Sequence, residues 1–109
     1  MVKANQKTIK KSANISGVGI HTGVYTNLTL LPAKANTGIC FIRTDLEGKP
    51  TIPANVDYVF STDRSTNLKL KNSEIHTVEH ILAAIISEEI DNIIIEVDNM
   101  EIPILDGSS

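Results

Sequence analysis

The pattern of apolar residues changes from strand-like to helix-like close to residue 77, and this change limits the possible folds more than any other feature. Before it, apolar and polar residues alternate in short runs, which is typical of strands with one buried face. After it, apolar residues recur at intervals of three and four, which is typical of an amphipathic helix. The 109 residues are enough for one domain with one modest core, so both element types must share it.

The alternating segments predict strands in the first two-thirds of the chain. Within residues 25–31, for example, Leu28 and Leu30 face one way while Asn27 and Thr29 face the other. We expect strands at residues 8–15, 25–31, 39–43, 52–59 and 67–70. The three glycines of residues 16–23 predict a tight, exposed turn between the first two strands.

The helical segment is expected over residues 78–88, with Thr77 as its N-cap. Its apolar stripe consists of Val78, Ile81, Leu82 and Ile85. Residues 92–97 then form a β-branched run typical of a central strand, and residues 98–99 should turn a hairpin into residues 100–103. The order of elements predicts an α+β fold, a two-layer sandwich in which one mainly antiparallel sheet carries a packed helix.

Composition excludes several classes of protein. The net charge is −3 and the Lys and Arg residues are scattered, so nucleic acid is not expected as a partner. No apolar run approaches the ~20 residues of a membrane span, and the polar N-terminus is unlike a signal peptide. The one cysteine, Cys40, cannot form an intramolecular disulfide and is expected to be a small buried apolar residue. These features predict a soluble, cytoplasmic protein.

The strongest local signal for chemistry is the run from His76 to His80, which reads H-x-x-E-H. As a bare pattern it is that of an inverted-zincin metallopeptidase, with His76 and His80 as zinc ligands and Glu79 as general base. Two histidines on a solvated helix face are the competing interpretation, and His76 precedes the expected N-cap. A further alternative is a non-catalytic α+β binding module, because a fold does not determine a function.

Several longer motifs carry a resemblance to a known family. Residues 16–23 read S-G-V-G-I-H-T-G, residues 77–80 read T-V-E-H, residues 91–97 match D-N-x-x-I-E-V, and residues 101–108 match E-I-P-I-x-D-G-S. Residues 32–38 and 43–45 also fit P-A-x-x-x-x-G and R-x-D. With this order and spacing, the chain resembles the UDP-3-O-acyl-N-acetylglucosamine deacetylases, zinc-dependent hydrolases of lipid A biosynthesis.

The resemblance implies roles for individual residues. His80, the histidine of T-V-E-H, would be a zinc ligand, and Glu79 would be the general base that activates the zinc-bound water against the acetamide carbonyl. His21 would lie near the mouth of the active site and contact substrate, although the sequence alone favours a role in the tight turn or in hairpin packing about equally. The segment from residue 61 to residue 68 would line the passage for the substrate and its acyl chain. Thr66, Asn67 and Leu68 would be the residues that contact the substrate.

The resemblance also bears on what the chain lacks. His76 falls at a position that is often Ser in the family, which disfavours the peptidase interpretation. The family has two similar domains, and its other zinc ligands lie in an H-K-x-x-D motif on the second, whereas this chain has no His-Lys dipeptide. Residues 1–109 would then be the N-terminal domain, with the C-terminal deacetylase domain as partner, and would be inactive in isolation. Residues 105–109 suggest a turn into a further helix and a truncated chain.

Overall fold

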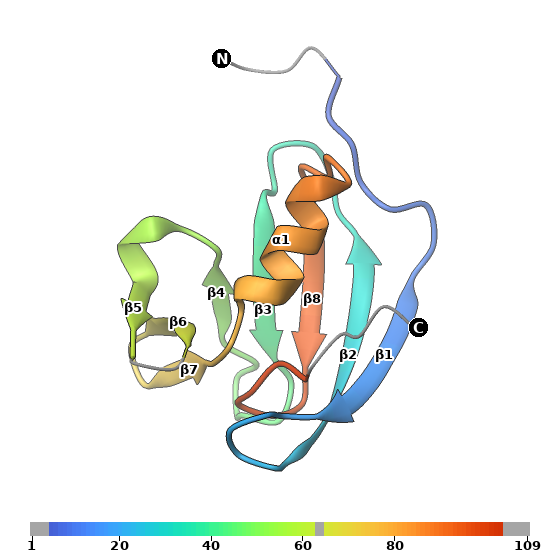
Figure 1. Cartoon of the computed structure of the whole chain (residues 1–109). Helices are drawn as coiled ribbons and strands as arrows, with labels where there is room; N and C mark the ends of the chain where they lie inside the picture. The colour runs from blue at the N-terminus through green and yellow to red at the C-terminus, as the bar shows by residue number, and fades with distance from the viewer. Residues whose placement is uncertain (1–4, 63–64, 104–109) are drawn as a thin grey trace.

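The computed structural model describes residues 5–62 and 65–103, and its main feature is a five-stranded mixed sheet (Figure 1). The strand order is β1-β2-β8-β3-β4, in which β3 and β8 run parallel and the other neighbours run antiparallel. The strands are β1 (Ala13–Val18), β2 (Tyr25–Pro32), β3 (Ile39–Arg43), β4 (Thr51–Pro53) and β8 (Ile93–Val97).

Strand β8 lies in the middle of this sheet, which confirms the central strand expected at residues 92–97. Its alternate residues Ile93, Ile95 and Val97 are buried, while the residues between them are only partly covered. Ile95 pairs with Phe41 of β3, and Val97 pairs with Leu28 of β2. Because side chains alternate between faces, a slip of one residue in this register would move the buried set to the outer face.

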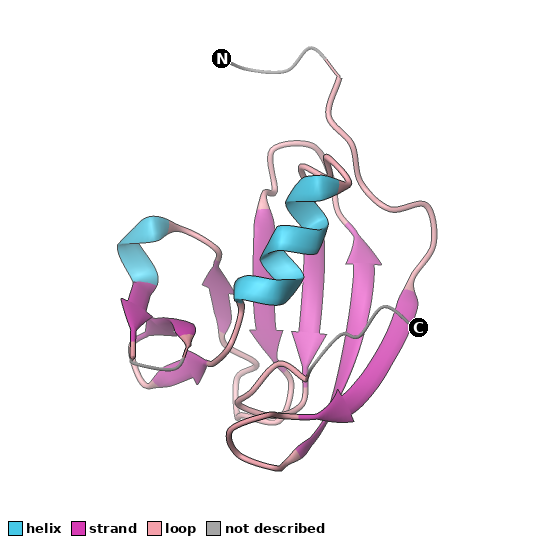
Figure 2. Cartoon of the chain, in the orientation of Figure 1, coloured by secondary structure: helices cyan, strands magenta, loops and turns pink. Residues whose placement is uncertain are grey.

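Helix α1 (Glu79–Ser87) covers one face of the sheet, crossing in front of β3 and β8 (Figures 1 and 2). Val78, Ile81 and Ile85 are buried in the core cluster, and Leu82 is partly buried against it. Ala83 and Ala84 are exposed on the other side of the helix. The expected α+β class, with a helix packed on a sheet, is confirmed.

A second, three-stranded antiparallel sheet lies beside β4 and was not expected as a separate unit (Figure 1). It consists of β5 (Val59–Ser61), β6 (Thr66–Leu70) and β7 (Ser73–Ile75). The strand expected over residues 52–59 is divided, because β4 ends at Pro53 and a 3₁₀ helix, η1 (Val56–Tyr58), follows. The Asn55 side chain caps η1 by accepting a hydrogen bond of 2.9 Å from the Asp57 amide.

Arg43 connects the two sheets from the end of β3. Its guanidinium forms a bidentate pair with Asp45, at 2.8 and 2.6 Å, and donates to the Glu74 carbonyl of β7 at 2.6 Å. The hydrogen bond from Arg43 also holds the pKa of Asp45 below its ordinary value. A buried cation needs these partners, and they hold the small sheet against the large one.

Two sequence-based boundaries were wrong for the same reason, long-range backbone pairing. The first strand begins at Ala13 rather than at residue 8, because the Lys7 carbonyl accepts hydrogen bonds from the amides of Asp91 and Asn92. The expected hairpin into residues 100–103 does not form. Instead, the Met100 carbonyl and the Ile102 amide bond to His76 in a parallel bridge.

The sequence also set expectations for Cys40, for membrane spans and for the C-terminal turn. Cys40, which was expected to be buried, is only partly buried, and this burial raises the pKa of its thiol. Within the described residues, no helix is long and apolar enough to cross a membrane. The turn expected at residues 105–109 lies outside the described residues.

Candidate functional site

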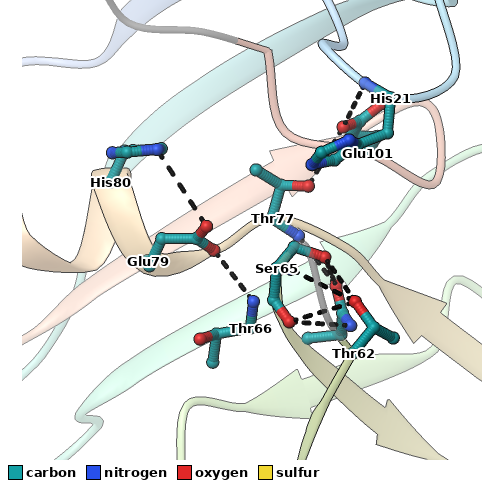
Figure 3. Close-up of polar contacts among 9 residues, drawn as sticks. His21, Thr62, Ser65, Thr66, Thr77, Glu79, His80 and Glu101 are labelled. Atoms are coloured by element: carbon teal, nitrogen blue, oxygen red, sulfur yellow. Dashed lines mark hydrogen bonds and ion pairs between the residues drawn. The ribbon is translucent and has the colours of Figure 1, made fainter.

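Glu79 and His80 lie together at the start of α1 (Figure 3). Glu79 is the first residue of the helix, where the helix dipole favours a carboxylate. Its Oε2 lies 4.0 Å from His80 Nε2. The His80 side chain is 66% exposed and that of Glu79 is 34% exposed, so both have surface open to solvent. An imidazole and a carboxylate are thus adjacent and accessible.

The Glu79 carboxylate is oriented by a backbone group from the small sheet. The Thr66 amide donates to Glu79 Oε1 at 3.1 Å. In return, the Val78 amide donates to the Thr66 carbonyl at 3.0 Å. This exchange fixes one carboxylate oxygen and leaves the other, Oε2, on the side of His80 (Figure 3). A carboxylate held in this way is suited to accept a proton at Oε2.

The three residues expected to contact substrate differ in their surroundings. Thr66 is partly exposed beside Glu79. The side chains of Asn67 and Leu68 are fully buried, and Leu68 belongs to the hydrophobic core. The Asn67 Oδ1 accepts a hydrogen bond of 3.0 Å from the Thr77 amide. Asn67 therefore supports the backbone before α1 from the interior, and Thr66 is the one of the three residues whose side chain is accessible. Residues 63 and 64 of the same passage lie outside the described residues.

Thr77 is not the N-cap that the sequence suggested. Val78 occupies that position, and no side chain caps the helix. Thr77 has φ of 63°, a left-handed conformation that is unfavourable for a β-branched residue. Its hydroxyl donates to Glu101 Oε2 at 3.0 Å instead of accepting from the first turn. Such strain costs on the order of 1–3 kcal/mol and persists only where surrounding contacts hold it.

His21 lies in the exposed turn between β1 and β2, and its side chain is exposed. The exposed turn expected from the glycines is confirmed from residue 20 onward, whereas residues 16–18, also expected in that turn, belong to β1. Figure 3 shows His21 on the Glu101 side of Thr77, away from Glu79 and His80. Its amide donates to the Glu101 carboxylate, at 3.0 Å to Oε2. The structure thus links the His21 turn to the segment before α1, although the His21 ring makes no such link itself.

Glu101 is the residue that the sequence reasoning missed. It is 1% exposed, yet its carboxylate accepts hydrogen bonds from His21, Thr22 and Thr77. Burial by itself would raise the pKa of Glu101, but the hydrogen bonds from Thr22, His21 and Thr77 outweigh burial and hold that pKa below its ordinary value. The sequence does hold one signal for Glu101, because it is the only charged residue in the otherwise apolar stretch from Met100 to Ile104.

His76 does not share a helix face with His80. It precedes α1 and lies opposite Glu101 in a β-bridge whose hydrogen bonds join His76 to Met100 and Ile102. Its Nε2 lies 2.8 Å from Glu74 Oε1, and its ring packs edge-on against Phe60 at 5.8 Å between centroids. The spacing that makes H-x-x-E-H a zinc motif depends on a continuous helix, so this geometry disfavours the inverted-zincin interpretation.

The residues around His80 fit a catalytic zinc site in part. An accessible imidazole next to a carboxylate is the donor chemistry that zinc hydrolases use, with three protein ligands in all. Within residues 5–62 and 65–103, however, no group of three His, Cys, Asp or Glu side chains could hold a metal ion. Two cavities, of about 420 and 180 Å³, are lined by residues other than Glu79 and His80. The described residues thus offer His80 and Glu79 side by side without a complete set of three ligands.

Comparison with known proteins matches the chain to one family over almost its whole length. Residues 6–109 match the family model of LpxC, UDP-3-O-acyl N-acetylglycosamine deacetylase. Relatives with the name UDP-3-O-acyl-N-acetylglucosamine deacetylase include those of Chlamydia caviae (51% identical) and Thermosynechococcus vestitus (47%), each aligned over 100% of this chain. The protein of Brucella melitensis is 44% identical over 99% of this chain.

These relatives are much longer than the chain. The matched region covers 39% of the Chlamydia caviae protein and 38% of the other two. The chain therefore spans about two-fifths of the length of the curated relatives it matches.

Proposed function

The chain belongs to the UDP-3-O-acyl N-acetylglycosamine deacetylase family, and from that premise we propose that it forms the N-terminal part of a zinc-dependent deacetylase of lipid A biosynthesis. The substrate would be UDP-3-O-acyl-N-acetylglucosamine, and the reaction would be hydrolysis of its N-acetyl group. The observation that carries the proposal is the pairing of Glu79 and His80 at the start of α1, both accessible and 4.0 Å apart. The protein would act in the cytoplasm.

In this proposal His80 holds the zinc ion and Glu79 is the general base. Zinc, when bound, would lower the pKa of a water molecule and polarise the acetamide carbonyl. Glu79 would accept the proton of that water at Oε2, the oxygen that the Thr66 amide leaves free. After the water oxygen has added to the carbonyl carbon, the same proton would be available for the leaving nitrogen of the sugar.

The remaining ligands would come from a part of the protein that this chain does not contain. The described residues place no third donor near His80, and the relatives are more than twice as long as the chain. A second deacetylase domain would therefore approach the exposed start of α1. The isolated chain would fold around its own apolar core but would hold zinc weakly and would not turn over substrate.

The substrate would meet the chain along the edge formed by Thr66, Glu79 and His80. Thr66 is partly exposed there, whereas Asn67 and Leu68 would act indirectly by supporting its position. His21 would reach the substrate from the turn beside Glu101, where its ring is exposed. These are the residues of this chain that we assign to the site.

The test is a deacetylation assay on the protein at the length of its relatives, with zinc content measured in parallel. His80→Ala should lose both zinc and activity, while Glu79→Gln should keep zinc and lose activity. His76→Ala is the matched control, because an inverted zincin would need His76 as much as His80. Retention of zinc and turnover by His80→Ala, or equal losses for both histidine variants, would contradict the proposal.

A further inference from the structure

Glu101 is a buried carboxylate to which the reaction proposed above gives no role. Its two oxygens accept from the His21 amide, from the amide and hydroxyl of Thr22 at 2.8 Å each, and from the Thr77 hydroxyl at 3.0 Å. These donors come from two segments far apart in sequence, the turn after β1 and the residue two places before Glu79. Figure 3 shows Glu101 between His21 and Thr77.

The close approach of Glu101 requires a glycine on the neighbouring turn. A Cβ added to Gly19 would lie 2.1 Å from Glu101 Oε1 and 2.7 Å from its Cδ. Real Cβ atoms do not approach so closely, so any side chain at residue 19 would displace the carboxylate from its donors. Gly19 and Glu101 thus form one unit, although they are remote in sequence.

Thr77 is held between two sets of contacts. On one side its hydroxyl donates to Glu101, and on the other its amide donates to Asn67 Oδ1 at 3.0 Å. Both sets together keep Thr77 at φ of 63°, from which Val78 and Glu79 start the helix. Without the hydrogen bond from Thr77 to Glu101, one of the two constraints on this unfavourable conformation is lost.

We infer that Glu101 is a positioning residue, which acts through Thr77 to orient Glu79 and His80 and which also fixes the turn of His21 and Thr22 on the other side of Thr77. The inference rests on the proposed deacetylase function. Glu101 touches neither Glu79 nor His80, so it takes no part in proton transfer. Catalytic groups misplaced by about 1 Å can lose on the order of 10² in rate, which is the kind of loss that a positioning residue prevents.

The experiment compares four variants in the zinc-loaded protein at the length of its relatives. Glu101→Gln keeps the shape but presents an amide NH₂ to donors on one side. Gly19→Ala keeps Glu101 and displaces it, and Thr77→Val removes only the hydroxyl. Asp98→Asn is the matched control, because the Asp98 carboxylate also accepts from a backbone amide, that of Asn27 at 2.8 Å, but its partner lies in β2 rather than at Thr77 or in the His21 turn.

We expect kcat per zinc-loaded molecule to fall about tenfold to a hundredfold in Glu101→Gln and Gly19→Ala, with KM unchanged. Because both changes disturb one unit, the double variant should lose no more than the worse single variant. Thr77→Val should show a smaller loss of the same kind. Asp98→Asn should match the unsubstituted protein. A contribution to stability only would lower the folded fraction and leave kcat per zinc-loaded molecule unchanged.

Amide hydrogen exchange gives a second readout that does not depend on turnover. In Glu101→Gln, exchange should quicken at His21 and Thr22 and also at Thr77 and Val78, whereas Asp98→Asn should affect Asn27 only. Unchanged kcat in Glu101→Gln, or loosening confined to the turn, would overturn the inference and leave the proposed function standing. A zinc-loaded, unsubstituted protein without deacetylase activity would overturn the proposed function itself.

Discussion

The sheet under α1 and the region before α1 are held together by different means. Under the helix, the core is almost wholly apolar, with Phe41, Ile95 and Ile85 among its buried members. Before the helix, buried polar groups meet from distant parts of the chain, among them Glu101 and Asn67. An apolar core tolerates substitutions that conserve volume, whereas a buried carboxylate needs all of its hydrogen-bond donors in place.

We expect turnover and stability to depend on different regions of this chain. The sheet and the apolar stripe of α1 build a core that needs no metal. The polar region contributes less apolar burial but determines where the Glu79 carboxylate points, through Thr66 and Thr77. Substitutions in the first region should change the free energy of unfolding, and substitutions in the second should change turnover first.

The largest expected effect is on turnover and comes from the polar region, that is, from Glu79 and the buried polar residues around the start of α1. In the longer protein, Glu79→Gln should lower kcat by ~10²–10⁴ because an amide cannot accept the proton of the water. The free energy of unfolding should stay nearly constant, since Glu79 is partly exposed. The measurement is kcat from steady-state kinetics on variant and unsubstituted protein whose zinc contents have been determined. Near-normal kcat in this variant would show that the base lies elsewhere.

The next effect is on stability and comes from the sheet. Ile95→Ala should lower the free energy of unfolding by about 2–5 kcal/mol, because Ile95 is fully buried in the central strand. Ile94→Ala is the matched control, one residue away on the partly covered face, and should cost less. Denaturant titration of both variants makes the comparison. Equal losses would mean that the two faces of β8 are equally covered.

The apolar region could be predicted from the sequence because its signals are local. The alternation in β2 and the spacing of Ile81 and Ile85 report directly on which side is buried. One strand was predicted over residues 52–59, where the structure has β4, η1 and the start of β5, because the Asn55 cap that marks η1 is a weak signal in a single sequence. Element types were therefore predicted better than element boundaries.

The sequence pointed to Glu79 and His80 through the H-x-x-E-H pattern and through the family resemblance, but neither revealed the buried polar contacts that surround them. Spacing gave Thr77 the role of an N-cap, since nothing local reveals that Glu101 takes its hydroxyl or that its φ is positive. It likewise suggested a hairpin where residues 100–102 in fact pair with His76. Contacts between residues so far apart leave no periodic trace in the sequence.

A smaller effect should appear in the pH dependence of stability. The pKa of Glu101 is lower in the folded state than its ordinary value, ~4.3 in an unfolded chain, so the folded state binds fewer protons in this range. Its stabilisation is present above the ordinary pKa and is lost as the pH falls through the folded pKa. At neutral pH, Glu101→Gln should cost about 1–3 kcal/mol.

Urea titrations of both proteins from neutral to acidic pH make this measurement. The difference between unsubstituted protein and Glu101→Gln should shrink as the pH falls, and Asp45, whose pKa is also lowered, should contribute equally to both. A difference that stays constant down to low pH would mean that the Glu101 charge does not stabilise the fold. The polar region would then resemble the sheet in being insensitive to protonation.

The smallest effect concerns the two sides of α1, where the two regions meet. Leu82 is partly buried against the core, so Leu82→Ala should cost about 1–2 kcal/mol. Ala83 is exposed, so Ala83→Ser should change the free energy of unfolding of this chain by no more than about 0.5 kcal/mol.

In the longer protein the same Ala83→Ser change should cost more, because a second domain that completes the zinc site would approach the exposed side of the helix near His80. Thermal melts of the chain and of the longer protein, each with and without Ala83→Ser, separate the two cases. An equal, negligible cost in both would place the second domain away from this side of α1 and confine the shared surface to the residues before the helix.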